Sequence, residues 1–468
     1  MDVTKHPYLS LAAEHAAMLY RLQRDSSFNP PPMTEVDGRR VSTFFKLCRT
    51  PQDLLTRSRL IEETTRAGSG VFNIVQAIGS DAIMALMIVS KNLDATDSGK
   101  GYFHRVSKFH EYVAKNDLAL AVGQTDVKGD RMLRPSEQAD KDLYLHVVKS
   151  DREGIVVRGA KAHTTQAIVS DEVVVLPTRA MTEADRDYAV AFSVPTNTRG
   201  LRLIARPLVE AESAATPEEG MISAKNIEVE SLTIFDDVFI PNDRVFLLRE
   251  WEAAGTLANL FGLYHRFTAL SYRQVIAETL LGAAKMMAEQ NGTDGVSHVR
   301  EKLAHLIMYR EQSRMAIRLA ALDAAKDELT GLVYPNSLWA NIGKLQSNTQ
   351  YMSSVQNMVD IAGGLISTMP SPEDYSRKDI GPLMKKYLAG NAKMSAEERM
   401  NLFRLIRELT GTMGGVLGPA MVHAEGSIAA SLIALSREYD FGSSKALIRE
   451  IMRKGAGTGT AKKPRARG

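Results

Sequence analysis

The sequence predicts an α+β protein, because segments of helical periodicity enclose one contiguous block of strands. Apolar residues recur at helical spacing through most of residues 1–118, and they do so again after residue 240. Between them the chain changes to short β-branched and apolar runs separated by turn residues. We therefore expect an N-terminal helical domain (1–118), a central β domain (119–240), a C-terminal helical bundle (241–454) and a disordered basic tail (455–468).

The N-terminal part is predicted to be a series of helices divided by proline and glycine. Residues 10–22, 52–66 and 71–91 carry the helical pattern, and residues 105–115 add a shorter amphipathic segment. The segment 71–91 is apolar almost all round, which is typical of a helix buried among other helices.

The central block begins with strands that are easy to recognise. Residues 143–148 and 155–158 flank the polar loop 150–154, which ends in glycine and predicts a β-hairpin. Residues 172–177 (EVVVLP) form a continuous apolar run, so we expect this strand to be covered on both faces. Further strands are expected at 188–194, 201–204 and 227–240, with an exposed loop at 213–220.

Two connections in this block combine small residues with hydrogen-bonding side chains. They are residues 124–131 (QTDVKGDR) and 159–167 (GAKAHTTQA). A flat ligand with polar edges, such as a flavin ring, needs close backbone approach and side-chain hydrogen bonds. The alternative is that the Asp, Thr and Gln side chains merely satisfy their own backbone. The residues alone leave both interpretations open.

The C-terminal part predicts long helices at 256–290, 296–328 and 337–361. Long helices in series pack as an up-and-down bundle. The apolar surface of the second and third is more than one subunit is expected to hide, which indicates self-association. Ser395 and Glu398 form a capping box that opens a helix over 397–410. A last helix pair is expected at 426–437 and 443–452.

Composition excludes several classes of protein. The 468 residues are 44% hydrophobic and 24% charged, which is ordinary for a soluble globular protein. The net charge is only +3 and much of the excess lies in the tail, so we expect no nucleic-acid partner. The single cysteine, Cys48, excludes a disulfide framework and suits a cytoplasmic protein. We see no secretory signal and no apolar segment of about 18 residues, so no membrane association is expected.

A set of local sequences spread over nearly the whole chain points to one family. They are DVKGDRMLRPSEQ (126–138), GIVVRGAKAHTTQA (154–167), AMTEADRDYAVA (180–191), FDDVFIPNDRV (235–245), NGTDGVSH (291–298), residues 363–374 and AEGS (424–427). Together they resemble the flavoprotein family of 4-hydroxyphenylacetate 3-hydroxylases and 4-hydroxybutyryl-CoA dehydratases. The resemblance implies an acyl-CoA dehydrogenase-like fold, FAD as cofactor and a homotetramer.

The resemblance also implies which residues contact the flavin. They are Lys128, Gly129, Asp130, Arg131, His163, Thr164, Thr165, Gly426 and Ser427. Fixed cations beside a glycine suit a pyrophosphate, so Lys128 and Arg131 are assigned to it. Thr164 and Thr165 are assigned to the edge of the isoalloxazine. For Arg131 the alternative is an ion pair with Asp130 or Glu137.

The chain departs from both branches of the family at their reactive residues. The dehydratases ligate an iron-sulfur cluster with three cysteines and a histidine. His265 is kept here, but the next ligand position is Tyr272, and Val122 stands where the hydroxylases carry a histidine. The first two cysteine positions and the hydroxylase Arg and Tyr positions fall on a stretch with Phe72, Asn73, Gln76 and Ala77. A thiolate cannot be replaced by tyrosine in such a cluster, so we predict no metal.

Four residues remain as candidates for catalysis. His265 and Tyr272 lie seven residues apart on one predicted helix face. We expect one of them to orient or deprotonate a substrate hydroxyl, and Arg273 to hold an anionic group. Glu230 corresponds to a catalytic carboxylate of the dehydratase branch. The alternatives are that Tyr264, His265 and Tyr272 only pack within a buried helix, and that Glu230 is a solvated strand residue.

These observations predict an enzyme, an FAD-dependent oxidoreductase. Its simplest form is a two-component monooxygenase that takes reduced FAD from a separate reductase and oxygenates a small aromatic substrate. The chain has no GxGxxG fingerprint before a strand-helix unit, which fits electrons arriving on diffusing flavin. The alternative is a cluster-free enzyme that acts on a CoA thioester, like 4-hydroxybutyryl-CoA dehydratase or vinylacetyl-CoA isomerase. A flavin-binding relative without activity is a third possibility.

Overall fold

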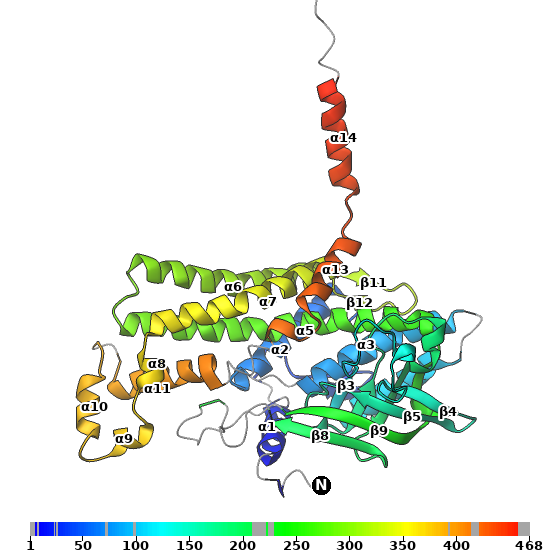
Figure 1. Ribbon diagram of the computed structural model, residues 1–468, viewed down its shortest axis with the longest axis horizontal. Coiled ribbons are helices and arrows are strands. Elements are labelled where there is room, and N and C mark those ends of the chain that lie inside the picture. The colour runs from blue at the N-terminus through cyan, green and yellow to red at the C-terminus, as the bar shows by residue number, and fades with distance from the viewer. Residues whose placement is uncertain are drawn as a thin grey trace, which may run out of the picture.

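Two four-stranded sheets lie against one end of a long helical bundle in the computed structural model of the chain (Figure 1). The structure describes residues 5–6, 9–22, 24, 27–70, 74–96, 100–207, 221–222, 229–391, 394–412 and 421–456. The predicted loop at 213–220 and almost all of the predicted tail lie outside these residues. No helix among the described residues has both the length and the apolar character needed to cross a membrane.

The N-terminal part contains the helices α1 (Leu9–Leu22), α2 (Pro51–Ala67), α3 (Ile74–Asp94) and α4 (Tyr102–Asn116). Asp53 and Thr50 form a capping box that starts α2. Residues 82–89 of α3 are all buried, as expected for a helix that is apolar on every side. The sequence did not predict the hairpin of β1 (Met33–Val36) and β2 (Arg39–Ser42), whose residues are mostly polar.

The central block is a sandwich of two sheets. One has the order β10 (Val245–Leu248), β7 (Val190–Pro195), β6 (Glu172–Val175) and β3 (Leu120–Gly123). The other has the order β4 (His146–Ser150), β5 (Gly154–Lys161), β9 (Val229–Pro241) and β8 (Leu201–Pro207). Only the β3–β6 pair is parallel among these strands. The predicted hairpin is β4–β5, although its first strand begins three residues later than expected.

The run EVVVLP is buried on both faces for a simple reason. Val173 and Val175 of β6 face the core between the sheets, where Phe192 and Phe235 meet edge to face at 5.7 Å. Val174 faces the other way, into a core shared with α3 and α5. This second core joins residues of all three predicted domains, whose limits stay a prediction.

The bundle consists of α5 (Trp251–Gln290), α6 (Ser297–Leu322) and α7 (Ser337–Ala362). We expected the second helix to continue to residue 328, and this was wrong. It ends at Leu322, and the chain turns back through β11 (Ala325–Lys326) and β12 (Val333–Tyr334). Asp327 stabilises that turn by accepting hydrogen bonds from the amide and hydroxyl of Thr330, at 2.8 and 2.6 Å.

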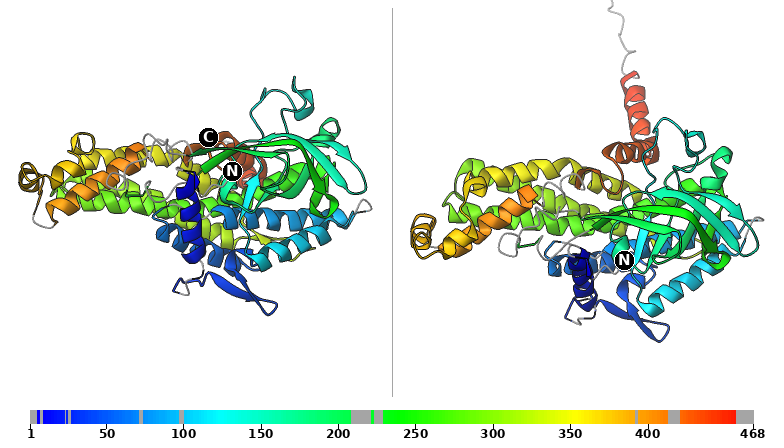
Figure 2. Two further views of the ribbon diagram at one scale, coloured as in Figure 1. Left: turned by 90° about the horizontal axis from the view of Figure 1, so that it is seen from below. Right: turned by 60° about the horizontal axis from the view of Figure 1, so that its bottom comes forward.

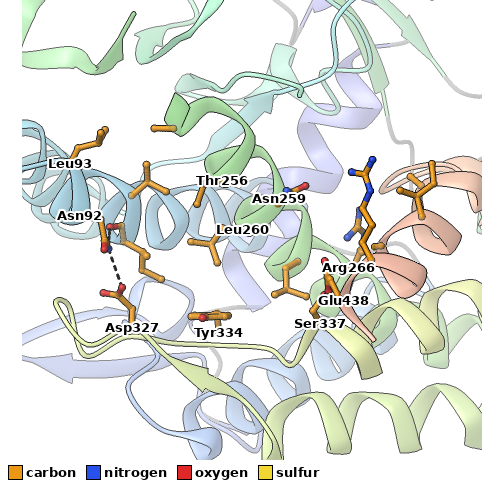
Figure 3. A pocket seen from close by; sticks show the side chains of 18 residues that line it. Asn92, Leu93, Thr256, Asn259, Leu260, Arg266, Asp327, Tyr334, Ser337 and Glu438 are labelled. Carbon is orange, nitrogen blue, oxygen red and sulfur yellow. Dashed lines mark hydrogen bonds between the residues drawn. The ribbon is translucent and has the colours of Figure 1, made fainter. Parts of the chain in front are cut away.

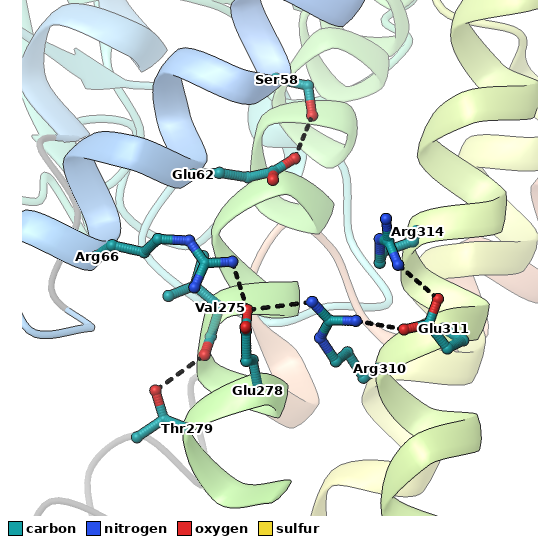
Figure 4. A network of polar contacts seen from close by, with 9 residues as sticks. All are labelled: Ser58, Glu62, Arg66, Val275, Glu278, Thr279, Arg310, Glu311 and Arg314. Atoms are coloured by element: carbon teal, nitrogen blue, oxygen red, sulfur yellow. Dashed lines mark hydrogen bonds and ion pairs between the residues drawn. The ribbon is translucent and has the colours of Figure 1, made fainter. Parts of the chain in front are cut away.

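A chain of charged side chains ties α2 to the bundle (Figure 4). Arg66 of α2 pairs with Glu278 of α5, which also lies 3.3 Å from Arg310 of α6. Glu311 then bridges Arg310 and Arg314. These groups are partly exposed, so each pair contributes at most about 1 kcal/mol.

Smaller helices complete the C-terminal part. They are α8 (Leu365–Thr368), α9 (Pro372–Ser376), α10 (Gly381–Tyr387), α11 (Ala396–Arg407), α13 (Ile428–Glu438) and α14 (Gly442–Ala456). The capping box of Ser395 and Glu398 starts α11, as predicted. Figures 1 and 2 show α14 standing away from the body of the protein.

We predict opposite effects for two glycine substitutions in the bundle. A Cβ added at Gly343 of α7 would collide with the Cβ of Ala316, whereas one at Gly282 of α5 would meet nothing within 4 Å. Gly343→Ala is expected to destabilise the protein by about 2 kcal/mol through overpacking. Gly282→Ala is expected to stabilise it by about 0.5–1 kcal/mol through helix propensity. Urea unfolding measures the free energy of unfolding of both variants. Equal changes in the two variants would contradict the packing of α6 against α7.

Candidate functional site

The segment 421–427, three helical residues followed by a tight turn, leads into α13 and forms one wall of the candidate site. Glu425 and Gly426 have φ angles of 56° and 100°, in the left-handed region. Ser427 caps α13 by accepting a hydrogen bond from the amide of Ala430 at 3.2 Å. A residue with a Cβ pays roughly 1 kcal/mol for such a φ angle, so contacts must hold Glu425 in place.

Those contacts come from α5. Arg273, which is fully buried, donates to the carboxylate of Glu425 at 2.5 Å, and the hydroxyl of Tyr272 donates to it at 2.6 Å. Arg273 also donates to Asn348 Oδ1 at 2.7 Å and to the carbonyl of Met421 at 2.8 Å. We assigned Arg273 to an anionic group of a substrate. Its guanidinium instead holds a carboxylate of the protein, which favours a positioning role.

The protonation states in this cluster follow from burial and charge. Burial alone would raise the pKa of Glu425, but the charge of Arg273 and the hydrogen bond from Tyr272 bring it below its ordinary value. Burial and the nearby Glu425 carboxylate raise the pKa of Tyr272 well above its ordinary value. Glu425 is therefore ionised, and Tyr272 keeps its proton and does not act as a base.

His265 is the group of this helix face that can take a proton. Its ring stacks on Phe261 at 5.5 Å, and its Nδ1 is buried without a hydrogen-bond partner among the described residues. Burial lowers the pKa of His265 to about 4, so the imidazole is neutral at pH 7.

Two further cations contact the turn, and the sequence analysis missed both. Lys344 of α7 is fully buried and donates to the carbonyl of Gly426, and burial lowers its pKa to about 7. The Nε of Arg266 donates to the carbonyl of Glu425 at 3.3 Å. Glu425 itself was also missed, although it stands inside the AEGS motif. Lys344 could have been found from the sequence, because it is a lysine on the apolar, buried side of the helix predicted at 337–361.

The loops of the β domain carry Lys128 and His163, and His163 is linked electrostatically to His423 beside the same turn. Burial lowers the pKa of Lys128, and the positive charges of Arg131 and Arg179 lower it further. Burial also lowers the pKa of His163, with additional effects from Lys128 and His423. Lys128 on the loop at 128–131 and His423 beside the turn are thus each close enough to His163 to act on it electrostatically.

Arg131 has no acidic partner among the residues that the structure describes. The carboxylate of Asp130 accepts the amide of Met132 at 2.9 Å, and that of Glu137 accepts the amide of Arg134 at 2.8 Å. The alternative of an ion pair between Arg131 and either acid is therefore wrong. Lys128 likewise forms no ion pair within the described part of the chain.

Gly129 and Asp130 shape the loop through Gln138. Its amide group exchanges two hydrogen bonds with the backbone of Asp130, at 3.0 and 2.9 Å. A Cβ at Gly129 would collide with the same amide group. The glycine is therefore required for packing, whatever ligand the loop binds.

Thr164 and Thr165, which follow β5, and Glu230 of β9 form the sheet side of the candidate site. Thr164 is fully buried, and its Oγ1 has no hydrogen-bond partner among the described residues. Thr165 donates to Glu230 at 2.6 Å. Burial raises the pKa of Glu230, with the Thr165 hydrogen bond acting against it. Glu230 is thus not a solvated strand residue, but its contact is with Thr165 rather than with His265.

The start of α3, where the family resemblance led us to look for reactive residues, holds structural contacts. Gln76 donates to Asp117 at 2.8 Å, and the carbonyl of Ala77 accepts a hydrogen bond from Arg57. Phe72 and Asn73 lie outside the described residues. Within the described ranges, no group of three or more His, Cys, Asp or Glu side chains could hold a metal ion.

Comparison with known proteins supports the same family over both halves of the chain. Residues 1–247 match the family model for the 4-hydroxyphenylacetate 3-hydroxylase N terminal part, and residues 254–453 match the model for its C terminal part. This chain belongs to the 4-hydroxyphenylacetate 3-hydroxylase family. The family predicted from the sequence is thereby confirmed.

Relatives of both branches of the 4-hydroxyphenylacetate 3-hydroxylase family are similar to this chain. The 4-hydroxybutyryl-CoA dehydratase/vinylacetyl-CoA-Delta-isomerase of Clostridium aminobutyricum is 32% identical over 95% of this chain and 93% of its own length. The 4-hydroxyphenylacetate 3-monooxygenase oxygenase component of Thermus thermophilus is 31% identical over 87% of this chain and 83% of its own.

Solved structures of both kinds share the fold. An archaeal 4-hydroxybutyryl-CoA dehydratase from N. maritimus superposes with a TM-score of 0.88 at 29% identity, covering 100% of this chain and 92% of that one. The oxygenase component HpaB of 4-hydroxyphenylacetate 3-monooxygenase, complexed with FAD and 4-hydroxyphenylacetate, superposes with a TM-score of 0.88 at 27% identity, covering 97% of this chain and 94% of that one. The predicted α+β fold is confirmed, and this chain shares it with both solved structures.

The depressed pKa of His265 predicts a specific loss of stability in acid. The His265 imidazole takes up a proton near pH 6.5 in the unfolded chain but only near pH 4 in the folded chain. The stabilisation of the fold by the neutral imidazole is therefore full above pH 6.5 and is lost as the pH falls toward 4. Between pH 7 and pH 5 the free energy of unfolding should fall by about 2 kcal/mol more in the native protein than in the His265→Gln variant. Urea unfolding at both pH values measures the difference. The exposed His298→Gln serves as control, and a His265→Gln variant with the native pH dependence would contradict the prediction.

Proposed function

We propose that this chain is the oxygenase component of a two-component monooxygenase. It binds FAD where the loops of the β domain face α5 and the turn before α13, and it oxygenates a small aromatic substrate. The observation that carries the proposal is a pair of features: Lys128 and Arg131 on the loop at 128–131 have no acidic partner among the described residues, and His265 on α5 is neutral with an Nδ1 that has no described partner.

The residues present fit FAD. Lys128, Arg131 and Arg179 supply the positive charge that a pyrophosphate needs, and the described chain gives the first two no ion pair. The unpartnered Oγ1 of Thr164 supplies a hydrogen-bonding group for a polar ring edge. Relatives of the oxygenase branch have been crystallised with FAD, which agrees with this cofactor.

Each residue of the α5 cluster then has a distinct role. Reduced flavin, when bound, supplies the electrons that activate oxygen. His265 accepts the proton of the substrate hydroxyl, because it is neutral and its Nδ1 is available. Tyr272 and Arg273 hold the Glu425 carboxylate, and through it the turn that carries Gly426 and Ser427. Glu425 is thus a positioning residue in this proposal.

Oxygen consumption with externally reduced FAD tests the proposal. The native chain should consume oxygen and convert a phenolic acid such as 4-hydroxyphenylacetate to a hydroxylated product. His265→Ala should slow product formation by about 10²–10⁴-fold, as expected for loss of a general base, while the bound flavin content stays the same. Product formation in His265→Ala at the native rate would remove His265 from the mechanism.

A second candidate function is supported by different observations. The C. aminobutyricum dehydratase/isomerase is similar over nearly the whole chain, and Glu230 is a largely buried carboxyl with a raised pKa, which suits an acid/base role. In this reading the chain shifts a double bond of a CoA thioester without a metal. Conversion of a butenoyl-CoA under anaerobic conditions, with no oxygen consumption on phenols, would favour it over the monooxygenase.

We further propose that the protein is a homotetramer, located in the cytoplasm. Large apolar side chains are exposed along the bundle, including Met308 (51%) and Met315 (60%) of α6 and Met352 (56%) of α7. The projecting helix α14 exposes Leu447 (58%) and Ile451 (56%). A monomer rarely leaves so much apolar surface in water, and a second copy is the simplest cover.

Light scattering after size exclusion measures the assembly. The full chain should have the mass of four copies. A chain that ends after Tyr439 and so lacks α14 should assemble into smaller species, because the apolar surface of that helix is lost. A chain that ends after Ala456 retains α14 and serves as the control. A monomeric full chain would contradict the proposal.

A further inference from the structure

A cavity of about 850 Å³ lies between α3, α5, α13 and β12 (Figure 3). None of its lining residues is among the proposed flavin contacts, although Arg266 at one end of the cavity contacts the turn that carries Gly426 and Ser427. Its size falls within the range of sites for small organic ligands.

The middle of the cavity is apolar. Ile88 and Val89 of α3, Leu260 and Leu263 of α5 and the ring of Tyr334 line it. Figure 3 shows Leu260 and Tyr334 between two polar ends. Such a lining suits the hydrocarbon body of an amphipathic molecule, because it offers apolar surface but few hydrogen-bonding groups.

One polar end is already satisfied by the protein. Asn92 donates to Asp327 at 3.0 Å, and the same carboxylate accepts two hydrogen bonds from Thr330. The negative charge at this end is therefore used to fix the β11–β12 turn. It offers little to a cationic ligand.

The other end carries cations with unused donors. Arg266 is largely enclosed and donates only from Nε, to the carbonyl of Glu425 at 3.3 Å. Its terminal nitrogens, and the whole guanidinium of Arg437, donate no hydrogen bond to any residue that the structure describes. Glu438 is the nearby acid, and its carboxylate accepts a hydrogen bond from Ser337. The donors left over at this end are therefore those of the two arginines and the side-chain amide of Asn259, which also lines the cavity.

We propose that this cavity binds a small amphipathic carboxylate. The carboxylate accepts hydrogen bonds from the terminal nitrogens of Arg266 in the planar geometry that suits a guanidinium, and Arg437 adds a second positive charge. The apolar body lies over Leu260 and Leu263. The ligand is linked to the candidate reaction site, because the Nε of Arg266 holds the backbone of Glu425. This binding does not depend on the proposed monooxygenase function, and it is expected with or without FAD.

Calorimetric titration of the purified full chain with 4-phenylbutyrate and with its uncharged primary amide tests the proposal. The carboxylate should bind at least ~10-fold more tightly than the amide, since a charge-assisted hydrogen bond is worth about 1.5–3 kcal/mol. Arg266→Gln should weaken carboxylate binding ~10-fold or more and leave amide binding unchanged. Arg318→Gln, a change at an exposed arginine of α6, is the matched control. Leu260→Trp, which fills the cavity, should abolish binding of both probes.

Several results would overturn the proposal. They are the absence of binding to the native chain, equal affinities for carboxylate and amide, and native carboxylate affinity in a folded Arg266→Gln or Leu260→Trp variant. Circular dichroism and thermal melting establish that the variants are folded. Binding to the chain that ends after Tyr439, but not to the full chain, would also overturn it, because α14 of a second copy would then be the natural occupant.

Discussion

The buried ion pair between Arg273 and Glu425 is the interaction on which the candidate site depends. It joins the middle of α5 to the turn before α13, segments that are 152 residues apart in the chain. Both partners have further hydrogen bonds, to Asn348 and Tyr272 respectively, so neither charge is left without a partner. Removing one partner of such a pair costs about 3–5 kcal/mol. The pair therefore fixes the left-handed backbone at Glu425 and, with it, the place of Gly426 and Ser427.

The electrostatics of the site follow from this pair. It neutralises one carboxylate with one guanidinium. On the loop of the β domain, Lys128 and Arg131 have no acidic partner among the described residues. The further charged groups that contact the turn are the cations Lys344 and Arg266 of the bundle. His265 stays neutral among them, because burial and neighbouring cations disfavour its charged form. A site of this kind attracts an anionic cofactor and keeps a proton acceptor beside it. The same excess of positive charge continues into the cavity at Arg266.

Much of the fold was predictable, because strong periodicity reports burial. The strand at 172–177 and the helix at 71–91 were predicted from apolar runs, and the strand and residues 82–89 of the helix are buried as expected. The β1–β2 hairpin was missed because its residues are polar, and the β11–β12 turn because the helical pattern runs on past Leu322. Within the site, local motifs indicated the loops with Lys128 and Thr164. They could not show that Arg273 pairs with Glu425, since that contact joins distant segments and leaves no local pattern.

The most direct test of the account is an equilibrium titration of the purified chain with FAD, followed by flavin fluorescence. The account predicts saturable binding that is at least ~10-fold weaker in Lys128→Ala, because a charge-assisted contact to the pyrophosphate is lost. Binding by Lys141→Ala, a change at an exposed lysine near the same sheet, should equal that of the native chain. No uptake of either oxidised or reduced flavin, or native affinity in Lys128→Ala, would contradict the account.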